Sequence, residues 1–462
     1  MNRRNSHTLE AATAKVLLTD TNQWGLAARL AIALAEAGCQ VSAICPAPGH
    51  ALMKTRAVQR TFRYSGIRPL QSLAAAIEAV TPDLVIPASD RGVEHLHELY
   101  ARAISRGEAG STTAELIERS LGLPASYSIV TSRHDLLAVA REEGIRVPNT
   151  SRLSVLEDLS CWQEGQLFPC VLKADGTWGG GGVRVVDSPE QAKQSFAQLS
   201  QMSRFSRAAK RFVVNRDPFW LRPWWQQSKR DVIVQSYIYG RPANCAVVCW
   251  KGRVLATICV EVIRSEGSTG PASVVRIVDN VEMKMAADKI AFRMELSGFF
   301  GLDFMIEEGT NAAYLIEMNP RATPPCHLRL GKGRDLAGAL WAQLSDQPLP
   351  EHSPVTENTL IAYFPQASKG NNDTLAGCFN DVPKGEPELV NELLNPFPDR
   401  TLLFRLVQRF TRMPIPARDS ELPRPPIADE PKLSEGLQSN SHEPLDATKI
   451  SPTLGKAGVR ST

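Results

Sequence analysis

The first hundred residues alternate short apolar runs with amphipathic stretches. An apolar run at 15–20 (KVLLTD) precedes a helical pattern over 24–37, and a second apolar run follows at 40–45 (QVSAIC). This order is typical of a β-α-β unit. The pattern recurs at 61–64, after Pro69 and at 83–89, with a helix from about Asp90. Because parallel strands require crossover connections, residues 15–105 are predicted to form a small doubly wound α/β unit.

A dinucleotide-binding domain is the main alternative for this unit. Its first turn, TDTNQWGLAA at 19–28, lacks the G-x-G-x-x-G pattern. Those glycines let the backbone approach a pyrophosphate closely. We therefore expect no nicotinamide or flavin role.

The remaining pattern is helical first and then rich in strands. Residues 113–145 are predicted to be helical, with Gly144 stopping the helix and Pro148 preventing its restart. Strand-like runs follow at 168–175, 183–188, 231–240, 243–250 and 253–263, with helices at 188–200 and 281–297 and two last strands at 298–308 and 312–320. This part is predicted to be α+β and mostly antiparallel.

Composition and charge narrow the class of protein. With 462 residues, 43% apolar and 22% charged, the chain is predicted to be a soluble globular protein of two or three packed units. A net charge of +3 gives no reason to expect nucleic acid or an acidic membrane surface as a partner. No window approaches ~20 uninterrupted apolar residues, and the N-terminus lacks a signal-peptide pattern. We expect a cytoplasmic protein.

The nine cysteines and the C-terminal composition complete this picture. No C-x-x-C pair occurs, so the cysteines are predicted to be reduced thiols without zinc, and Cys245 and Cys249 to share one buried strand face. Beyond about residue 415, Pro, Ser, Glu and Lys dominate. That segment cannot bury enough apolar surface to order itself, so it is predicted to be disordered.

A lysine and a glycine-rich turn form the first candidate site. Lys173 ends a predicted strand, and Gly176 and Gly179–Gly182 fill the turn that follows. A plain hairpin needs one or two glycines, whereas a flap of bare amides that closes over phosphates explains five. Lys173 would place its charge on a phosphate. The alternative is a loose surface hairpin, and the absence of G-K-[ST] before a helix excludes a Walker A motif.

Two carboxylates form the second candidate site. Asp303 and Glu317 lie on consecutive strands joined by a turn at 308–310, so they can meet across a hairpin. Asn319 lies two residues beyond Glu317 and shares its face. Because their neighbours are apolar, a hard divalent cation such as Mg²⁺ would explain these oxygen ligands. Arg321 follows at once and could hold a phosphoryl group or an acyl-phosphate. The alternative is a surface hairpin with ordinary ion pairs.

Together these residues resemble the ATP-grasp superfamily over about 115–345. The order of Lys173, a glycine flap, a hinge, an aspartate and the E-x-N-P-R motif is similar to the branch of biotin carboxylase, carbamoyl-phosphate synthetase, D-alanine–D-alanine ligase and the L-amino-acid ligases. The resemblance implies an N-terminal Rossmann-like (pre-ATP-grasp) domain at 1–112, a linker helix at 113–165, a two-part ATP-grasp domain at 166–350, a C-terminal extension at 351–414 and a tail at 415–462.

The resemblance also implies roles for single residues. Lys173 would contact the nucleotide phosphates, Gln235 and the hinge residues Ser236, Tyr237 and Ile238 would hold adenine, and Asp303, Glu317 and Asn319 would bind Mg²⁺, with Mn²⁺ as the alternative ion. Three positions depart from the family pattern. Arg133 stands where a lysine is usual, Asn244 replaces the ribose-binding glutamate, and Gln235 is neutral. The metal ligands are intact, which favours an active enzyme.

The activity implied is an ATP-dependent ligation of a small-molecule carboxylate to an amine through an acyl-phosphate. The alternatives are a phosphotransferase, a carboxylase-like step with bicarbonate, and a nucleotide-binding regulator without turnover. Arg264 and Arg276, in the loop 264–276, could pair a second substrate carboxylate, and His327 could accept a proton. For the two arginines the competing interpretation is a solvated loop charge, and for His327 it is a structural role. The tryptophans of 217–227 are predicted to pack on the sheet or on a second copy in a homodimer, with an apolar substrate as the alternative.

Overall fold

The computed structural model describes ten stretches of the chain, all of them within the folded unit formed by residues 1–410. They are residues 13–22, 25–46, 49–107, 110–163, 168–174, 182–200, 232–266, 270–349, 352–369 and 376–396. The predicted tail beyond 415 falls outside them. Within these stretches, no helix is long and apolar enough to cross a membrane.

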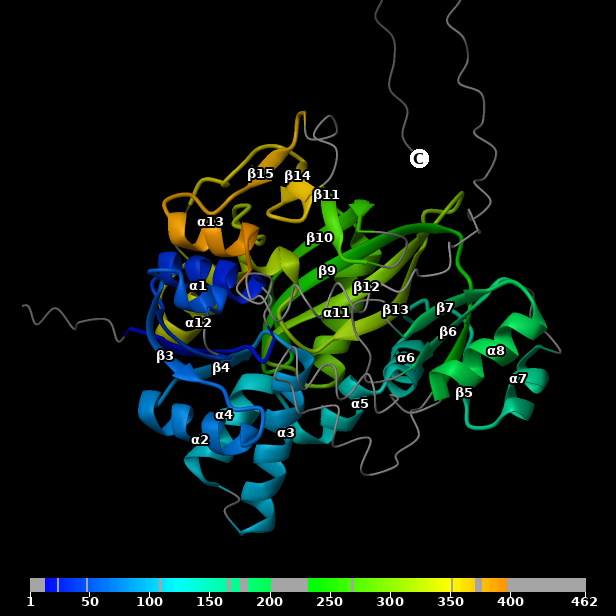
Figure 1. Cartoon of the computed structure of the whole chain (residues 1–462), viewed down its shortest axis with the longest axis horizontal. Helices are drawn as coiled ribbons and strands as arrows, with labels where there is room; N and C mark the ends of the chain where they lie inside the picture. The colour runs from blue at the N-terminus through cyan, green and yellow to red at the C-terminus, as the bar shows by residue number, and fades with distance from the viewer. Residues whose placement is uncertain are drawn as a thin grey trace, which may run out of the picture. The chain divides into compact units, whose positions relative to one another are not determined.

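The N-terminal part is a parallel sheet with helices on both faces (Figure 1). Its strands are β1 (Lys15–Thr19), β2 (Gln40–Cys45), β3 (Val58–Arg63) and β4 (Leu84–Pro87), in the order β3-β2-β1-β4. Its helices are α1 (Leu26–Ala37), η1 (Ala51–Met53), α2 (Pro69–Val80), α3 (Asp90–Ser105) and α4 (Thr112–Leu121). The doubly wound α/β unit expected from the sequence is therefore confirmed.

Alternation along β1 explains why helices cover both faces. Val16 and Leu18 pack with α1, whereas Leu17 packs with side chains of α2, α3 and α4. All three are fully buried. Because the three central residues of β1 are apolar on both faces of the strand, both faces must be covered.

The helical stretch at 113–145 is broken, which corrects the expectation of one continuous run. It divides into α4, η2 (Pro124–Ser126), α5 (Tyr127–Thr131) and α6 (Arg133–Glu142). Gly122 has φ +99°, and Pro124 follows two residues later, so the first helix cannot continue. Gly144 has φ +69° just after α6 and ends that helix as predicted.

Gly122 also provides a test of how α4 packs against the rest of the unit. A Cβ at this position would lie 2.3 Å from the backbone oxygen of Glu295, and the φ is left-handed. We expect Gly122→Ala to lower the free energy of unfolding by about 2–4 kcal/mol, from backbone strain plus overpacking. Gly107→Ala is the matched control, because its φ is +75° but nothing lies within 4 Å. Gly107→Ala should lower the free energy of unfolding by about 1 kcal/mol. If chemical denaturation gives equal losses of unfolding free energy for the two variants, the close contact between Gly122 and the Glu295 backbone is unimportant.

A small antiparallel sheet follows, with helices over one face (Figure 1). Its strands are β5 (Thr150–Leu153), β6 (Cys170–Ala174), β7 (Val183–Val186) and β8 (Val232–Ser236), in the order β5-β8-β6-β7. The helices are α7 (Leu156–Gln163) and α8 (Pro189–Ser200). Leu172 of β6 and Val234 of β8 point into the cluster that these helices form with the sheet.

The third sheet has seven strands in the order β13-β12-β9-β10-β11-β14-β15. They are β9 (Gly240–Trp250), β10 (Arg253–Ser265), β11 (Ala272–Val278), β12 (Gly298–Glu307), β13 (Ala313–Asn319), β14 (Leu360–Tyr363) and β15 (Phe379–Asp381). The helices around it are α11 (Val281–Arg293), η4 (Pro324–His327), α12 (Leu336–Ser345), η5 (Ala367–Lys369) and α13 (Pro387–Leu394). Its pairs are antiparallel apart from the parallel β14–β15 pair.

Helix α11 is shorter than the predicted 281–297. It ends at Arg293, and Glu295 adopts a left-handed φ of +46° before β12 begins at Gly298. The apolar pattern continued into residues that belong to the turn and the strand, so periodicity alone placed the boundary too late.

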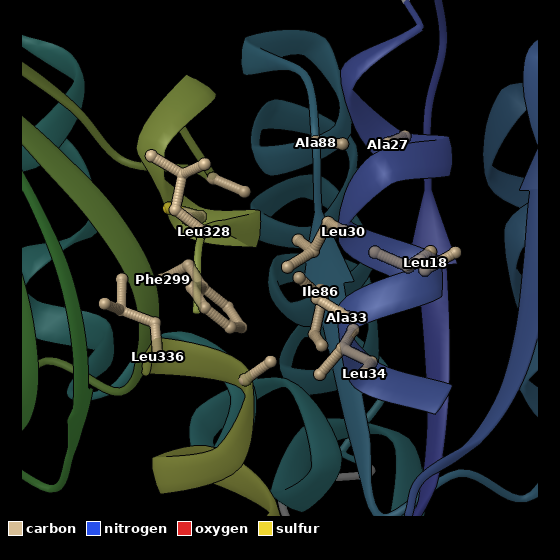
Figure 2. Close-up of a cluster of buried hydrophobic side chains, with 14 of the residues drawn as sticks. Leu18, Ala27, Leu30, Ala33, Leu34, Ile86, Ala88, Phe299, Leu328 and Leu336 are labelled. Carbon is tan, nitrogen blue, oxygen red and sulfur yellow. The ribbon is translucent and has the colours of Figure 1, made fainter. Parts of the chain in front are cut away.

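The two faces of the large sheet belong to different cores. One face packs on α6 and α11 and includes Cys245 and Cys249, which confirms that these two cysteines share a buried face. The other face contributes Phe299 to a cluster with η4, α12, α1 and β4. Figure 2 shows that cluster, with Leu30 and Leu34 of α1 on one side and Phe299, Leu328 and Leu336 on the other.

Candidate functional site

Three polar side chains form a row across neighbouring strands of the large sheet. Asp303 of β12 lies directly opposite Glu317 of β13 and directly opposite Asn244 of β9. Asn319 lies two residues beyond Glu317, opposite Gly301. The hairpin pairing expected from the sequence is therefore present, and directly opposed residues share a face of a sheet.

The Asp303 carboxylate is held by two amides. Asn244 Nδ2 donates to Asp303 Oδ1 at 2.6 Å, and Asn319 Nδ2 donates to Asp303 Oδ2 at 2.9 Å. Burial raises the pKa of Asp303, and the nearby Glu317 charge raises it further. A cation beside Asp303 and Glu317 would offset the burial and the mutual repulsion that disfavour the ionised form of Asp303.

The Glu317 carboxylate has cationic neighbours, chiefly Arg133 and Lys173. Arg133, at the start of α6, donates from NH2 to Glu317 Oε1 at 2.7 Å and from NH1 to the Ala174 carbonyl at 2.8 Å. Burial by itself would raise the pKa of Glu317, but Arg133 and Lys173 outweigh burial and hold it below its ordinary value. Glu317 is therefore ionised in the folded chain, ready to face a cation.

Lys173 reaches the same place from the small sheet. Leu172 and its even-numbered neighbours in β6 face α7 and α8, so Lys173 points to the opposite face. Its Nζ donates to the Ile316 carbonyl of β13 at 3.3 Å. Burial lowers the pKa of Lys173 to about 8, with Glu317 acting in the opposite direction. Only 5% of this lysine is exposed.

The predicted hinge joins the two sheets. Gln235, in β8, alternates with Val232 and Val234 and so lies on the same face of the small sheet as Lys173. It is buried, and its Nε2 has no hydrogen-bond partner among the described residues. The Ser236 amide donates to the Asn149 carbonyl at 2.9 Å, and the Tyr237 ring meets Tyr239 edge to face at 4.8 Å. Ile238 lies in the connection to β9.

Arg321 ties the N-terminal sheet to this site. Its Nε donates to Asp90 Oδ1 at 2.9 Å, and its NH2 donates to Asn319 Oδ1 at 3.2 Å. The next residue, Ala322, donates its amide to the Pro87 carbonyl at the end of β4. The carboxyl edge of the parallel sheet is thus joined directly to the end of β13.

Several predicted residues lie elsewhere or cannot be placed. Gly176, Gly179, Gly180, Gly181 and the 217–227 segment lie outside the described residues, whereas the carbonyl of Gly182 accepts from the Ala174 amide at 3.0 Å. Arg264 donates to the Ser273 hydroxyl and to the Ala367 carbonyl. Arg276 is exposed, with its NH1 3.9 Å from Glu261 Oε2. These contacts support the structural interpretation of both arginines.

Sequence reasoning missed the distant partners of the site. Asp90 binds Arg321 from another sheet, and Asp381 binds His327 from β15 with 2.7 Å between its Oδ2 and His327 Nε2. A residue that is paired only by tertiary folding leaves no spacing pattern, so no local signal could have found these contacts.

The row on the large sheet fits a hard divalent cation. Asp303 and Glu317 offer carboxylate oxygens, and Asn319 offers an amide oxygen, which are the ligand types that Mg²⁺ prefers. Asn244 Oδ1 is buried without a hydrogen-bond partner among the described residues. No group of three His, Cys, Asp or Glu residues suited to a metal occurs in the described ranges, so a metal bound by this carboxylate pair would also need amide, water or phosphate oxygens.

Comparisons with known proteins agree with this geometry. Residues 135–325 match the family model described as the ATP-grasp domain. The chain contains an ATP-grasp domain. The matched stretch begins two residues after Arg133 and ends shortly after Arg321, so it includes the described residues of the small sheet and the row on the large one. No curated protein matches the sequence.

Solved structures share the fold over most of the chain at low sequence identity. N5-carboxyaminoimidazole synthetase from Staphylococcus aureus complexed with ADP has a TM-score of 0.52 and 14% identity, over 73% of this chain and 79% of that one. N5-carboxyaminoimidazole synthase from Aspergillus clavatus has a TM-score of 0.52 and 16% identity, over 73% and 78%. The biotin carboxylase domain of Hydrogenobacter thermophilus 2-oxoglutarate carboxylase has a TM-score of 0.51 and 17% identity, over 74% and 71%. These similarities establish the fold alone.

Proposed function

We propose that this ATP-grasp protein is a Mg²⁺- and ATP-dependent ligase that joins a small-molecule carboxylate to an amine. The row of Asn244, Asp303 and Glu317 carries the proposal, because two half-buried carboxylates directly opposite one another call for a cation between or beside them. Of the similar structures, the Staphylococcus aureus synthetase binds ADP and the Hydrogenobacter thermophilus domain binds Mg-ADP and bicarbonate, which supports nucleotide and carboxylate chemistry for this fold.

In this proposal, residues of the small sheet and residues of the large sheet bind different parts of the nucleotide. Lys173 would place its ammonium on the phosphates, and Gln235 with residues 236–238 would hold the adenine. Asn244 would hydrogen-bond the ribose hydroxyls. Asp303, Glu317 and Asn319 would hold Mg²⁺, which when bound neutralises phosphate charge. Gly179–Gly182 would close over the phosphates.

The ligation itself would proceed by phosphorylation of the acid and displacement by the amine. Arg321 is anchored by Asp90 and Asn319, so its guanidinium is already oriented beside the side chains proposed to bind Mg²⁺. It would bind the acyl-phosphate oxygens, and this pre-positioning is the main source of rate in such a step. The contribution of the chain's own groups is orientation and charge neutralisation.

ADP release from the purified protein tests the proposal directly. Amino acids and small acids are screened in pairs with Mg-ATP, each alone and both together. We expect ADP and phosphate to appear in equal amounts only when acid and amine are both present. Release with amine and bicarbonate in place of the acid would instead indicate a carboxylase-like enzyme, and a phosphate left on the acceptor would indicate a phosphotransferase. A protein that binds ATP but yields no ADP with any pair would overturn the ligase assignment.

A further inference from the structure

A buried polar cluster joins η4, α1 and β15 and has no role in the mechanism above. His327 of η4 donates from Nε2 to Asp381 Oδ2 of β15 at 2.7 Å. Arg29 of α1 donates from NH1 to the Asp381 carbonyl at 2.6 Å and from NH2 to Asp381 Oδ1. Only 8% of His327 and 4% of Asp381 are exposed. Three elements distant in sequence therefore meet at one carboxylate.

This arrangement fixes which nitrogen of His327 is basic. Asp381 already accepts from Arg29 and is a hydrogen-bond acceptor only, so the His327 proton resides on Nε2. Nδ1 is then the nitrogen with the lone pair. It is buried and has no hydrogen-bond partner among the described residues. The same holds for the Tyr363 hydroxyl, whose ring centroid is 6.5 Å from that of His327.

Two buried polar atoms without hydrogen-bond partners, on two neighbouring rings, are costly. Each unsatisfied group costs roughly 1–3 kcal/mol, so a bound group that donates to both would recover much of that energy. Burial raises the pKa of Tyr363 well above its ordinary value, and Asp381 and Cys326 add to the effect. The hydroxyl therefore stays protonated, and its oxygen accepts a hydrogen bond while its proton remains available.

The turn that carries His327 packs on the same face of the large sheet as the row of Asn244, Asp303 and Glu317. Thr323, which precedes η4, packs over Gly301, where an added Cβ would lie 2.4 Å from Thr323 Cγ2. Gly301 is two residues before Asp303 on the same strand face, about 7 Å along β12. Cys326, adjacent to His327, is close enough to Arg321 for its positive charge to oppose the burial that raises the pKa of the thiol to about 11. The turn that carries His327 therefore covers the sheet face that carries the metal row.

We propose that His327 Nδ1 accepts the proton of the incoming ammonium group, with the Tyr363 hydroxyl as the second contact and Asp381 as the positioning residue. The inference rests on the proposed ligase function and assigns the amine side of that reaction. An ammonium donates to two acceptors at once, which is what the two orphan atoms require.

The step balances without a further reactant. R–NH₃⁺ gives one proton to Nδ1 and becomes R–NH₂, whose lone pair forms the C–N bond at the acyl carbon. The C–O bond to phosphate breaks, and phosphate leaves with that electron pair. The second nitrogen proton leaves on the departing phosphate, and His327 returns its own proton to solvent.

His327→Gln separates this role from a purely structural one. The glutamine Nε2 takes the place of the imidazole Nε2 and can still donate to Asp381, but it offers no basic nitrogen. Two nucleophiles are compared in the presence of acid and Mg-ATP. The first is the amine found in the screen, and the second is hydroxylamine, which is largely uncharged at neutral pH and needs no base. Amide and hydroxamate formation are both measured.

We expect His327→Gln to reduce amide formation about 100-fold relative to hydroxamate formation, the lower end of general-base effects. Equal changes in the two rates would overturn the proposal, because a structural defect does not distinguish the nucleophiles. His352→Gln, in an exposed loop, is the matched control and should leave the ratio unchanged. If wild-type protein forms neither product, the ligase function has failed rather than this inference.

Tyr363→Phe is a second variant for the case that His327→Gln does not fold. It removes one hydroxyl from a buried ring and keeps the packing. We expect the KM for the amine to rise about tenfold with the KM for the acid unchanged, as for the loss of one hydrogen bond. An equal rise in both KM values would contradict contact with the amine.

Discussion

Glu317→Gln should reduce ADP release by at least ~1,000-fold, because it removes a negative charge from the site proposed to hold Mg²⁺. The carboxylate lies directly opposite Asp303 and is held ionised by Arg133 and Lys173. Glutamine keeps the shape of the side chain and one oxygen, so the loss reports charge rather than packing. Coupled ADP-release kinetics at increasing Mg²⁺ concentration measure it.

Glu308→Gln is the control for this substitution. Glu308 lies in the exposed turn of the same hairpin, so the change in net charge is identical but remote from the row. We expect turnover within twofold of wild type, as for an exposed charge. Full activity of Glu317→Gln would contradict the metal assignment, provided that circular dichroism shows the native fold for both variants.

Lys173→Met should weaken the use of ATP by about 100-fold in kcat/KM, mainly through KM. The ammonium is buried between the two sheets, where a charge–phosphate contact is stronger than in water. Methionine has a similar length and stays apolar, so the ligand-free fold should lose little. Because burial already disfavours the lysine charge, we expect the melting temperature without nucleotide to change by only a few degrees.

Lys193→Met provides the comparison for Lys173. Lys193 lies on the exposed side of α8, so it loses the same charge away from the facing surfaces of the sheets. Its ATP kinetics should match those of wild type. Calorimetric measurement of the affinity for a nucleotide analogue, with and without Mg²⁺, would show whether Lys173 contributes to nucleotide binding. An unchanged affinity in Lys173→Met would remove it from the phosphate site.

Periodicity located the elements more accurately than it located their ends. Side chains of a strand point alternately to its two faces, and sequence spacing encodes this direction. It accounts for the two faces covered by Val16, Leu17 and Leu18 of β1 and for the register of Asp303 with Glu317. The continuous helix expected at 113–145 and the late end of α11 were wrong. Gly122, Pro124 and Glu295 set those boundaries through backbone conformation, which an apolar pattern does not report.

By itself, the sequence determined the α/β unit, the two strand-rich blocks and the pairing of Asp303 with Glu317, because each depends on local spacing. Only the tertiary structure revealed that Asn244 completes the row, that Asp90 anchors Arg321, and that Asp381, itself bound by Arg29, holds His327. These contacts join strands and helices from different sheets. Which side chains meet across such a distance depends on how the elements pack. The packing energy is spread over whole cores, so no local sequence pattern predicts these partners.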